Sequence, residues 1–251
     1  MAKFEIKDGV AIIPEGTTEI SNYAFDDCHT LESIVIPESV TEIGYAAFFR
    51  CVALKSIIIP ESVTKIGEAA FVGCSSLESI VVAEGNPVYD SREGCNAIIE
   101  TKTNILCYGS KSTIIPESVT KIGQHAFAGC SSLERVTIPM TVTEIGDFAF
   151  CDCRLLESIA IPESVTKIGN SAFKGCKSLK SIIIPEFVTK IDSFAFSGCS
   201  SLKCVTFLSR TKLSDEVFSY SSRITINVPR DCVDYYKELL PEKFHYKIVE
   251  R

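Results

Sequence analysis

The chain has 251 residues, of which 46% are hydrophobic and 23% are charged, and its net charge is −7. This composition supplies enough apolar side chains for a buried core. The acidic balance argues against a nucleic-acid partner, because phosphate binding needs clustered Lys and Arg, and against an anionic membrane surface. No run of 18 apolar residues occurs, so we expect no transmembrane helix and no membrane insertion.

The start of the chain, Met1 to Asp8, lacks the apolar stretch of a signal peptide. If Met1 is the native start, we expect a cytoplasmic protein. If a signal peptide was removed, the same chain would belong at the cell surface or be secreted.

Cysteine, proline and phenylalanine recur on one grid of 23 residues. Residues 37–59 read PESVTEIGYAAFFRCVALKSIII, and residues 162–184 read PESVTKIGNSAFKGCKSLKSIII. Self-similarity at such a period predicts stacked repeats. The interval from Cys74 to Cys130 equals one repeat of 23 residues plus one of 33, so one coil carries an insertion. The phenylalanines on the grid are Phe25, Phe48, Phe71, Phe127, Phe150, Phe173 and Phe196.

Each coil begins with Leu-x-x-Ile-x-Ile-Pro, which has the alternation of a strand that the proline ends. Gly44 and its equivalents are expected to permit a tight turn. Ala47 and Phe48 should then point inward, and Cys51 should close the coil. No coil can bury these groups alone, so stacking is expected to place Phe48 between Phe25 and Phe71.

The pattern predicts one domain over residues 1–251. An N-terminal hairpin cap with an Asp8-Gly9 turn covers residues 1–13, and a helix ended by Pro241 with a final strand forms the C-terminal cap at 229–251. Between them lie three 23-residue repeats (14–82), a longer repeat with a hairpin (83–115), four 23-residue repeats (116–207) and a degenerate repeat (208–228).

The Leu-x-x-Ile-x-Ile pattern resembles the leucine-rich repeat. Its fuller form, Ile-Pro-x-Ser-Val-Thr-x-Ile-Gly-x-x-Ala-Phe-x-x-Cys, resembles the BspA-like (Treponema-type) bacterial subfamily over residues 14–207, apart from the insertion. The resemblance implies a right-handed, β-rich leucine-rich-repeat solenoid with a parallel sheet on its concave side. Members resemble surface-attached binding proteins, some of which engage host matrix proteins. The convex segments should be short, because Val-Thr-x-Ile-Gly is too short and too β-branched for a helix.

Little in the sequence indicates catalysis or a cofactor. The three histidines, His29, His125 and His245, form no Ser/His/Asp or Cys/His set, so we predict no enzyme and no catalytic residue. Cys151-Asp152-Cys153 resembles half a metal site, but no second pair has suitable spacing, so no metal is predicted. The glutamates that follow the prolines are expected to form a solvated acidic edge rather than a calcium ladder.

The cysteines on the grid are expected to be buried thiols. Neighbouring coils place them within disulfide range, but their parallel Cβ vectors disfavour the required torsion. In the insertion, a turn at Lys102-Thr103 would place Cys107 opposite Ile98 and Cys95 on the other face, so no disulfide is expected there. These readings favour a reducing compartment.

The outward-facing position before each buried isoleucine of the first strand is mostly apolar. The series comprises Ile12, Val35, Ile58, Val81, Ile114, Thr137, Ala160, Ile183 and Thr206. Serines occupy most neighbouring outward positions, among them Ser56 and Ser79, with Arg135 in one coil. β-Branched residues here could serve strand stability alone. The alternative is a docking stripe, because monomers seldom expose long apolar patches.

The predicted function is therefore a non-enzymatic scaffold that binds a protein, from a host or a second copy, or a glycan. The predicted binding residues are Ile12, Val35, Ile58, Val81, Ile114, Arg135, Ile183, Ser56 and Ser79 on the concave sheet. A structural spacer or a self-associating homodimer is the alternative, and an enzyme is a more remote one. No cofactor is predicted.

Overall fold

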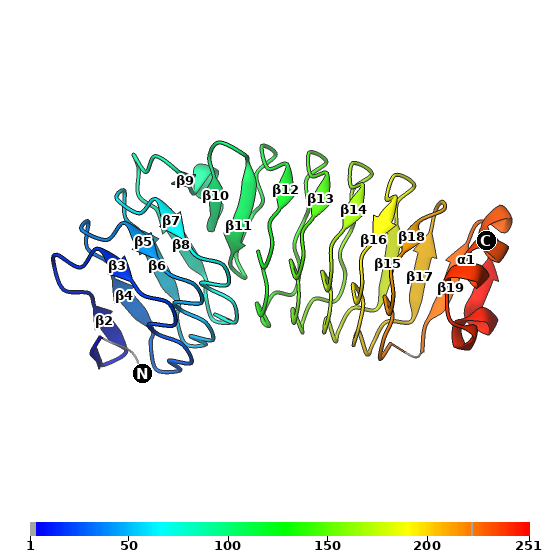
Figure 1. Ribbon diagram of the computed structural model, residues 1–251, viewed down its shortest axis with the longest axis horizontal. Helices are drawn as coiled ribbons and strands as arrows, with labels where there is room; N and C mark the ends of the chain where they lie inside the picture. Colours follow the sequence, from blue (N-terminus) through cyan, green and yellow to red (C-terminus); the bar gives the residue numbers. More distant parts are fainter. Residues whose placement is uncertain (1–3, 222) are drawn as a thin grey trace.

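The computed structural model describes residues 4–221 and 223–251 as a solenoid whose coils are stacked along a curved arc (Figure 1). A regular coil contains a first-strand segment, which is a strand in most coils, a two-residue second strand and a turn segment that carries the Ala-Phe-x-x-Cys motif. Equivalent residues of successive coils lie beside one another; Ile57, for example, pairs with Ile80, and Ile43 with Ile66. The expected β-rich solenoid with parallel ladders is confirmed.

The first strands run parallel but divide into three sheets, β1-β2-β4, β6-β8 and β15-β17-β19-β20. Only β1, in the N-terminal hairpin, is antiparallel to its neighbour. The strands are β1 (Ile6–Lys7), β2 (Val10–Ile12), β4 (Ser33–Val35), β6 (Ser56–Ile59), β8 (Ser79–Val82), β15 (Ser181–Ile184), β17 (Cys204–Phe207), β19 (Thr225–Val228) and β20 (Ile248–Glu250).

In the middle coils the equivalent segments, 135–138 and 158–161, are not assigned as strands, and no backbone hydrogen bond joins one to the other. Their buried side chains, Ile138, Ile159 and Ile161, still pack in the core. Apolar packing and the second-strand ladder therefore hold these coils together, and the ladder of first strands is interrupted where the sequence pattern alone suggests one continuous sheet.

The second strands form a shorter N-terminal ladder, β3-β5-β7, and a longer one that continues through the insertion, β18-β16-β14-β13-β12-β11-β10-β9. The strands are β3 (Glu19–Ile20), β5 (Glu42–Ile43), β7 (Lys65–Ile66), β9 (Tyr89–Asp90), β10 (Ala97–Glu100), β11 (Ile105–Gly109), β12 (Lys121–Ile122), β13 (Glu144–Ile145), β14 (Lys167–Ile168), β16 (Lys190–Ile191) and β18 (Lys212–Leu213).

The phenylalanine column forms as expected. Phe48 lies between Phe25 and Phe71, with ring centroids 5.3 Å apart on both sides and nearly parallel planes. Phe4 stacks on the first ring of the column, and Phe244 packs edge-on against its last member, Phe218. The column thus continues into both caps.

The cysteine column lies beside the phenylalanine column and satisfies backbone acceptors. The Cys51 thiol donates to the Phe25 carbonyl of the preceding coil at 3.1 Å, and Cys176 repeats the contact on Phe150 at 3.2 Å. In the degenerate last coil, the Ser221 hydroxyl makes the equivalent bond. All twelve cysteines are free thiols.

The positions before each turn segment are glycine for a different reason from the expected tight turn. Gly44 and Gly67 are not in the left-handed region, so no tight turn demands them. A Cβ on Gly67 would lie 2.5 Å from the Tyr45 nitrogen. These positions are glycine because successive coils approach too closely for a side chain. The left-handed residues lie further along each coil, as at Arg50 (φ 55°) and Gly73 (φ 83°).

The insertion contains β9, a 3-10 turn η1 (Arg92–Gly94) and the antiparallel pair β10-β11, near the crown of the arc in Figure 1. Near its tip the pairing is as predicted, with Glu100 opposite Ile105. A register shift between Ile98 and Ile99 then places Tyr108, not Cys107, opposite Ile98. The prediction for Cys107 was wrong, because a bulge moves the register by one residue.

The β10-β11 hairpin separates two clusters of buried side chains. Ile98 and Tyr108 belong to the N-terminal cluster, whereas Ala97, Ile99 and Leu106 belong to the C-terminal cluster. The hairpin therefore lies between two cores as a septum, with apolar side chains on both faces.

The insertion does not separate the neighbouring coils equally on every face. On the turn segments, the Gly73 N–H donates directly to the Ala128 carbonyl at 3.0 Å, so no layer intervenes. On the first-strand side, the Ile114 N–H donates to Cys95 of the insertion at 3.1 Å. An additional segment thus lies between β8 and Ile114 and, through Tyr108 and Gly109, between Phe71 and Ala126, but not between Gly73 and Ala128.

The C-terminal cap consists of η2 (Arg230–Cys232), α1 (Val233–Leu239), η3 (Glu242–Lys247) and β20. Tyr236 and Leu240 are buried against the last coil, and the Tyr236 hydroxyl donates to the Ser209 carbonyl at 2.8 Å. The expected helix and final strand are present. In the part of the chain that the structure describes, no helix is long and apolar enough to cross a membrane.

Candidate binding surfaces

The outward side of the first strands, here called the Ile-strand face, exposes the predicted apolar side chains. Their exposed fractions are 67% for Ile12, 55% for Val35, 61% for Ile58, 42% for Val81, 76% for Ile114 and 55% for Ile183. The alternation that buries Ile57 and Ile59 turns Ile58 outward. The side chains are therefore available for contact.

Four of these residues form one continuous row. The register pairs Ile12 with Val35 and Ile58 with Val81, and β4 packs beside β6. We call Ile12, Val35, Ile58 and Val81 the N-terminal stripe. The insertion separates this stripe from Ile114.

Beyond the insertion the row changes character. Thr137 and Ala160 are exposed, and Ile183 pairs with Thr206, which is buried. Arg135 is exposed, but it belongs to these later coils. The predicted stripe is therefore apolar throughout only in its N-terminal part.

The border of the N-terminal stripe is polar but internally neutralised. Ser56 and Ser79 face each other across β6 and β8. Next to them runs a row of alternating charges: Lys55 pairs with Glu32 at 2.5 Å, and Lys111 pairs with Glu78 at 2.6 Å. The hydrogen bond from Lys111 lowers the pKa of Glu78. A partner on the stripe thus meets no uncompensated charge at this border.

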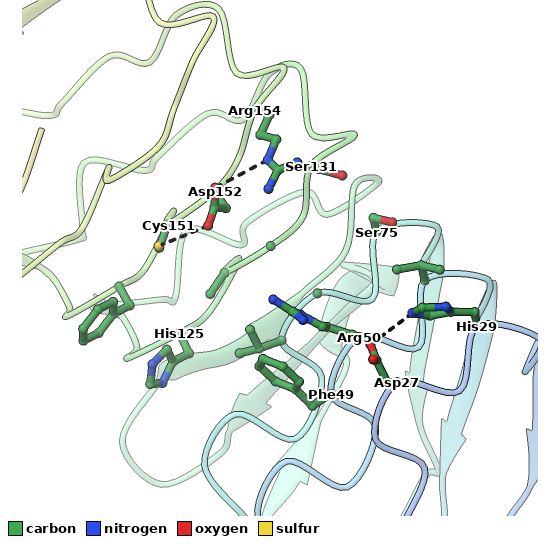
Figure 2. A pocket seen from close by; sticks show the side chains of 16 residues that line it. Asp27, His29, Phe49, Arg50, Ser75, His125, Ser131, Cys151, Asp152 and Arg154 are labelled. Carbon is green, nitrogen blue, oxygen red and sulfur yellow. Dashed lines mark hydrogen bonds and ion pairs between the residues drawn. The ribbon is translucent and has the colours of Figure 1, made fainter. Parts of the chain in front are cut away.

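The turn segments carry a hollow of about 530 Å³ that the sequence did not reveal (Figure 2). It lies beside the Gly73–Ala128 contact and brings together side chains from both sides of the insertion. Its charged and aromatic lining includes Asp27, His29, Phe49, Arg50, His125, Phe148, Asp152 and Arg154.

The hollow unites two of the three histidines, but among the described residues neither imidazole is hydrogen-bonded to a thiol or hydroxyl, and the Cys151 thiol donates to Asp152 at 4.0 Å instead. His29 contacts Asp27 at 3.0 Å, and the His125 ring stacks on Phe148 at 5.1 Å. Burial lowers the pKa of His125, whose Nδ1 is buried without a partner among the described residues. Burial, reinforced by Asp152, raises the pKa of the nearby Cys151 thiol to about 11. That thiol is protonated at neutral pH and is a poor nucleophile.

Within residues 4–221 and 223–251, no group of three or more His, Cys, Asp and Glu side chains could hold a metal ion. Cys153 is buried in the thiol column and donates to the Phe127 carbonyl. The Cys151-Asp152-Cys153 motif is therefore divided between the hollow and the core.

The repeat geometry agrees with a known sequence family. The sequence model of the family described as "BspA type Leucine rich repeat region (6 copies)" matches residues 9–94 and 97–225, which is most of the chain. The chain belongs to the BspA-type leucine-rich-repeat family. No curated protein sequence matches this BspA-type protein significantly.

Solved structures share its fold. A leucine rich cell surface protein from Faecalibacterium prausnitzii A2-165 is 35% identical, with a TM-score of 0.75 over 87% of this chain and 58% of that one. A leucine-rich repeat protein from Eubacterium ventriosum is 23% identical, with a TM-score of 0.59 over 88% and 72% of the two chains. The pneumococcal vaccine antigen PcpA is 19% identical, with a TM-score of 0.65 over 96% and 66%.

This BspA-type protein spans little more than half the length of the F. prausnitzii chain. The two more distant structures show the shared fold alone. The leucine-rich-repeat fold suggests a scaffold for protein binding.

Proposed function

We propose that this BspA-type protein is a non-enzymatic recognition scaffold that binds a protein segment along the N-terminal stripe. The observation that carries the proposal is the unbroken row Ile12, Val35, Ile58 and Val81, each between 42% and 67% exposed. Burial of these side chains by a partner would stabilise the complex by roughly 1–2 kcal/mol per side chain.

The surroundings of the stripe also favour a protein partner. Ser56 and Ser79 offer hydroxyls that can orient a polypeptide. The neighbouring charges are already paired with each other, so that burial beside them leaves no isolated ion. Ile114, Arg135 and Ile183 would contribute only to a partner long enough to pass the insertion.

The double variant Ile58→Lys, Val81→Glu tests the proposal. The two positions are cross-strand neighbours, so the new side chains can pair with each other and preserve the β6-β8 ladder. The apolar row is nevertheless lost from its centre. We expect the immobilised variant to lose the partner that the wild-type chain captures from its native environment, with an unchanged melting temperature.

The matched control is Glu61→Ala, on the exposed glutamate edge of the same coil. This variant should capture as much partner as wild type, because a hydrated, screened carboxylate contributes little to binding. If the folded double variant still captured the partner, the apolar residues of the stripe would serve strand stability alone and not binding. If light scattering gave the wild-type protein twice the mass of one chain and the double variant the mass of a single chain, the partner would be a second copy.

A further inference from the structure

The hollow on the turn segments owes its shape to two glycines. One left-handed residue stands before each grid cysteine, and stacking aligns these residues in a column that includes Asp27, Arg50, Gly73, Gly129 and Asp152. A Cβ on Gly129 would lie 2.6 Å from the Gly73 Cα, so Gly129 has no room for a side chain, and a Cβ on Gly73 would crowd the Arg50 side chain at 3.1 Å. The column therefore has a gap at its centre, with Arg50 on one side and Asp152 on the other.

Arg50 is a cation without an ionic partner in this gap. Its guanidinium lies 5.3 Å from the centre of the Phe49 ring and has no hydrogen bond or ion pair in the described part of the chain. The other arginine of the hollow is different, because Arg154 contacts Asp152 at 3.4 Å. Asp27, the carboxylate next to Arg50 in the column, contacts His29 instead. Figure 2 shows the Arg50 side chain reaching into the middle of the hollow.

The remaining lining offers apolar walls and two unused hydroxyls. Phe49 and Val72 line the hollow from the N-terminal coils, and Phe148 lines it from the C-terminal coils. The hydroxyls of Ser75 and Ser131 have no hydrogen-bond partner among the residues that the structure describes. A volume of about 530 Å³ lies within the range of small-molecule sites.

We propose that this hollow binds a small carboxylate with a flat apolar body. The planar guanidinium of Arg50 matches the two oxygens of a carboxylate and already rests on an aromatic ring. Ser75 and Ser131 can donate further hydrogen bonds to the ligand, while Phe49 and Phe148 cover its body. The site is independent of the N-terminal stripe and does not rest on the function proposed above.

Phenylacetate and its neutral analogue phenylacetamide are suitable probes, titrated into isotope-labelled full-length protein and followed by NMR. We expect phenylacetate to shift amide signals around Gly73 and Gly129. Arg50→Gln should weaken this binding by about tenfold without changing the melting temperature, because Arg50 is exposed. Arg154→Gln is the matched control and should bind within about twofold of wild type, since its guanidinium is already engaged.

The proposal would be overturned if phenylacetate did not bind the wild-type chain, if phenylacetamide bound with equal affinity, or if Arg50→Gln kept its full affinity. An equal loss in Arg154→Gln would also overturn it, because attraction would then come from general positive charge rather than from Arg50. Ser131→Trp, which places a bulky ring at the rim, should block the probe while leaving the fold intact.

Discussion

At the scale of single residues, Phe71 shows how the repeat makes one side chain important to two neighbours. Its ring stacks on Phe48 at 5.3 Å and meets Tyr108 of the insertion edge-on at 5.2 Å. The ring is 5% exposed. It therefore joins the regular coils to the septum.

We expect Phe71→Ala to lower the free energy of unfolding by roughly 3–5 kcal/mol, through lost burial and a cavity. The melting temperature should fall by about 10 °C in a chain of this size. Thermal unfolding followed by circular dichroism measures the change. Tyr246→Ala, at a side chain that is 79% exposed, should leave the melting temperature within about two degrees. A Phe71 variant as stable as that control would contradict the stacked-column core.

The residues that the sequence places correctly are those whose environment repeats. Phe48 and Ile58 lie where the 23-residue grid puts them, because each coil offers the same surroundings. Gly44 was misinterpreted, since a sequence cannot distinguish a glycine needed for its backbone angle from one needed for close contact. The sequence shows that Gly73 and Gly129 occupy equivalent positions in the coils on either side of the insertion. That these two glycines touch depends on how many layers the insertion adds to each face, which the spacing alone does not give.

At the scale of elements, the β10-β11 hairpin is the exception to the repeat. Its turn and both strands could be predicted from the alternation around Lys102, but the shift between Ile98 and Ile99 could not. The shift aims Tyr108 at the N-terminal core, where its hydroxyl donates to the Gly67 carbonyl at 2.7 Å. The neighbouring Gly109 leaves space on the opposite side for the Phe127 ring.

A methyl group at Gly109 should disturb this fit. The Cβ of Gly109→Ala would lie 2.2 Å from the Phe127 ring, which is itself fixed by stacking on Phe150 at 5.0 Å. We expect the free energy of unfolding to fall by about 1–3 kcal/mol, measured by urea denaturation. Gly94→Asn is the control: a Cβ there meets no atom within 4 Å, and asparagine tolerates its left-handed backbone. Equal stabilities of the two variants would show that the ring moves aside freely.

At the scale of the whole molecule, the buried thiols give the fold a common dependence on pH. Burial raises the pKa of Cys51, Cys130 and Cys199 from an ordinary value of 9.0 to about 12 in each case. Burial also raises the pKa of Cys74 and Cys153 well above that value. The thiols therefore keep their protons in the folded chain under conditions in which the unfolded chain loses them.

The free energy of unfolding should be constant between pH 7 and 8 and should fall above pH 9, as the unfolded thiols ionise. Each buried thiol contributes about 1.4 kcal/mol per pH unit between its unfolded and folded pKa values. Urea midpoints between pH 7 and 10 measure the effect, and comparison with a cysteine variant separates the thiols from the tyrosines, whose ordinary pKa of 10.0 falls in the same range. The double variant Cys51→Ser, Cys199→Ser should show a shallower decline, because serine does not ionise there and Ser221 already replaces a thiol. Identical slopes would contradict this origin.

The septum also bears on how such a chain can change in length during evolution. The coils of residues 116–207 pair in one register, with residues 23 apart opposite each other. A duplicated 23-residue unit would therefore pair with its new neighbours in the same way. The N-terminal stripe lies wholly on the other side of the hairpin, and no residue after Arg154 lines the hollow. Gain or loss of a coil near Ile168 would therefore alter the span of the molecule while both surfaces were inherited intact.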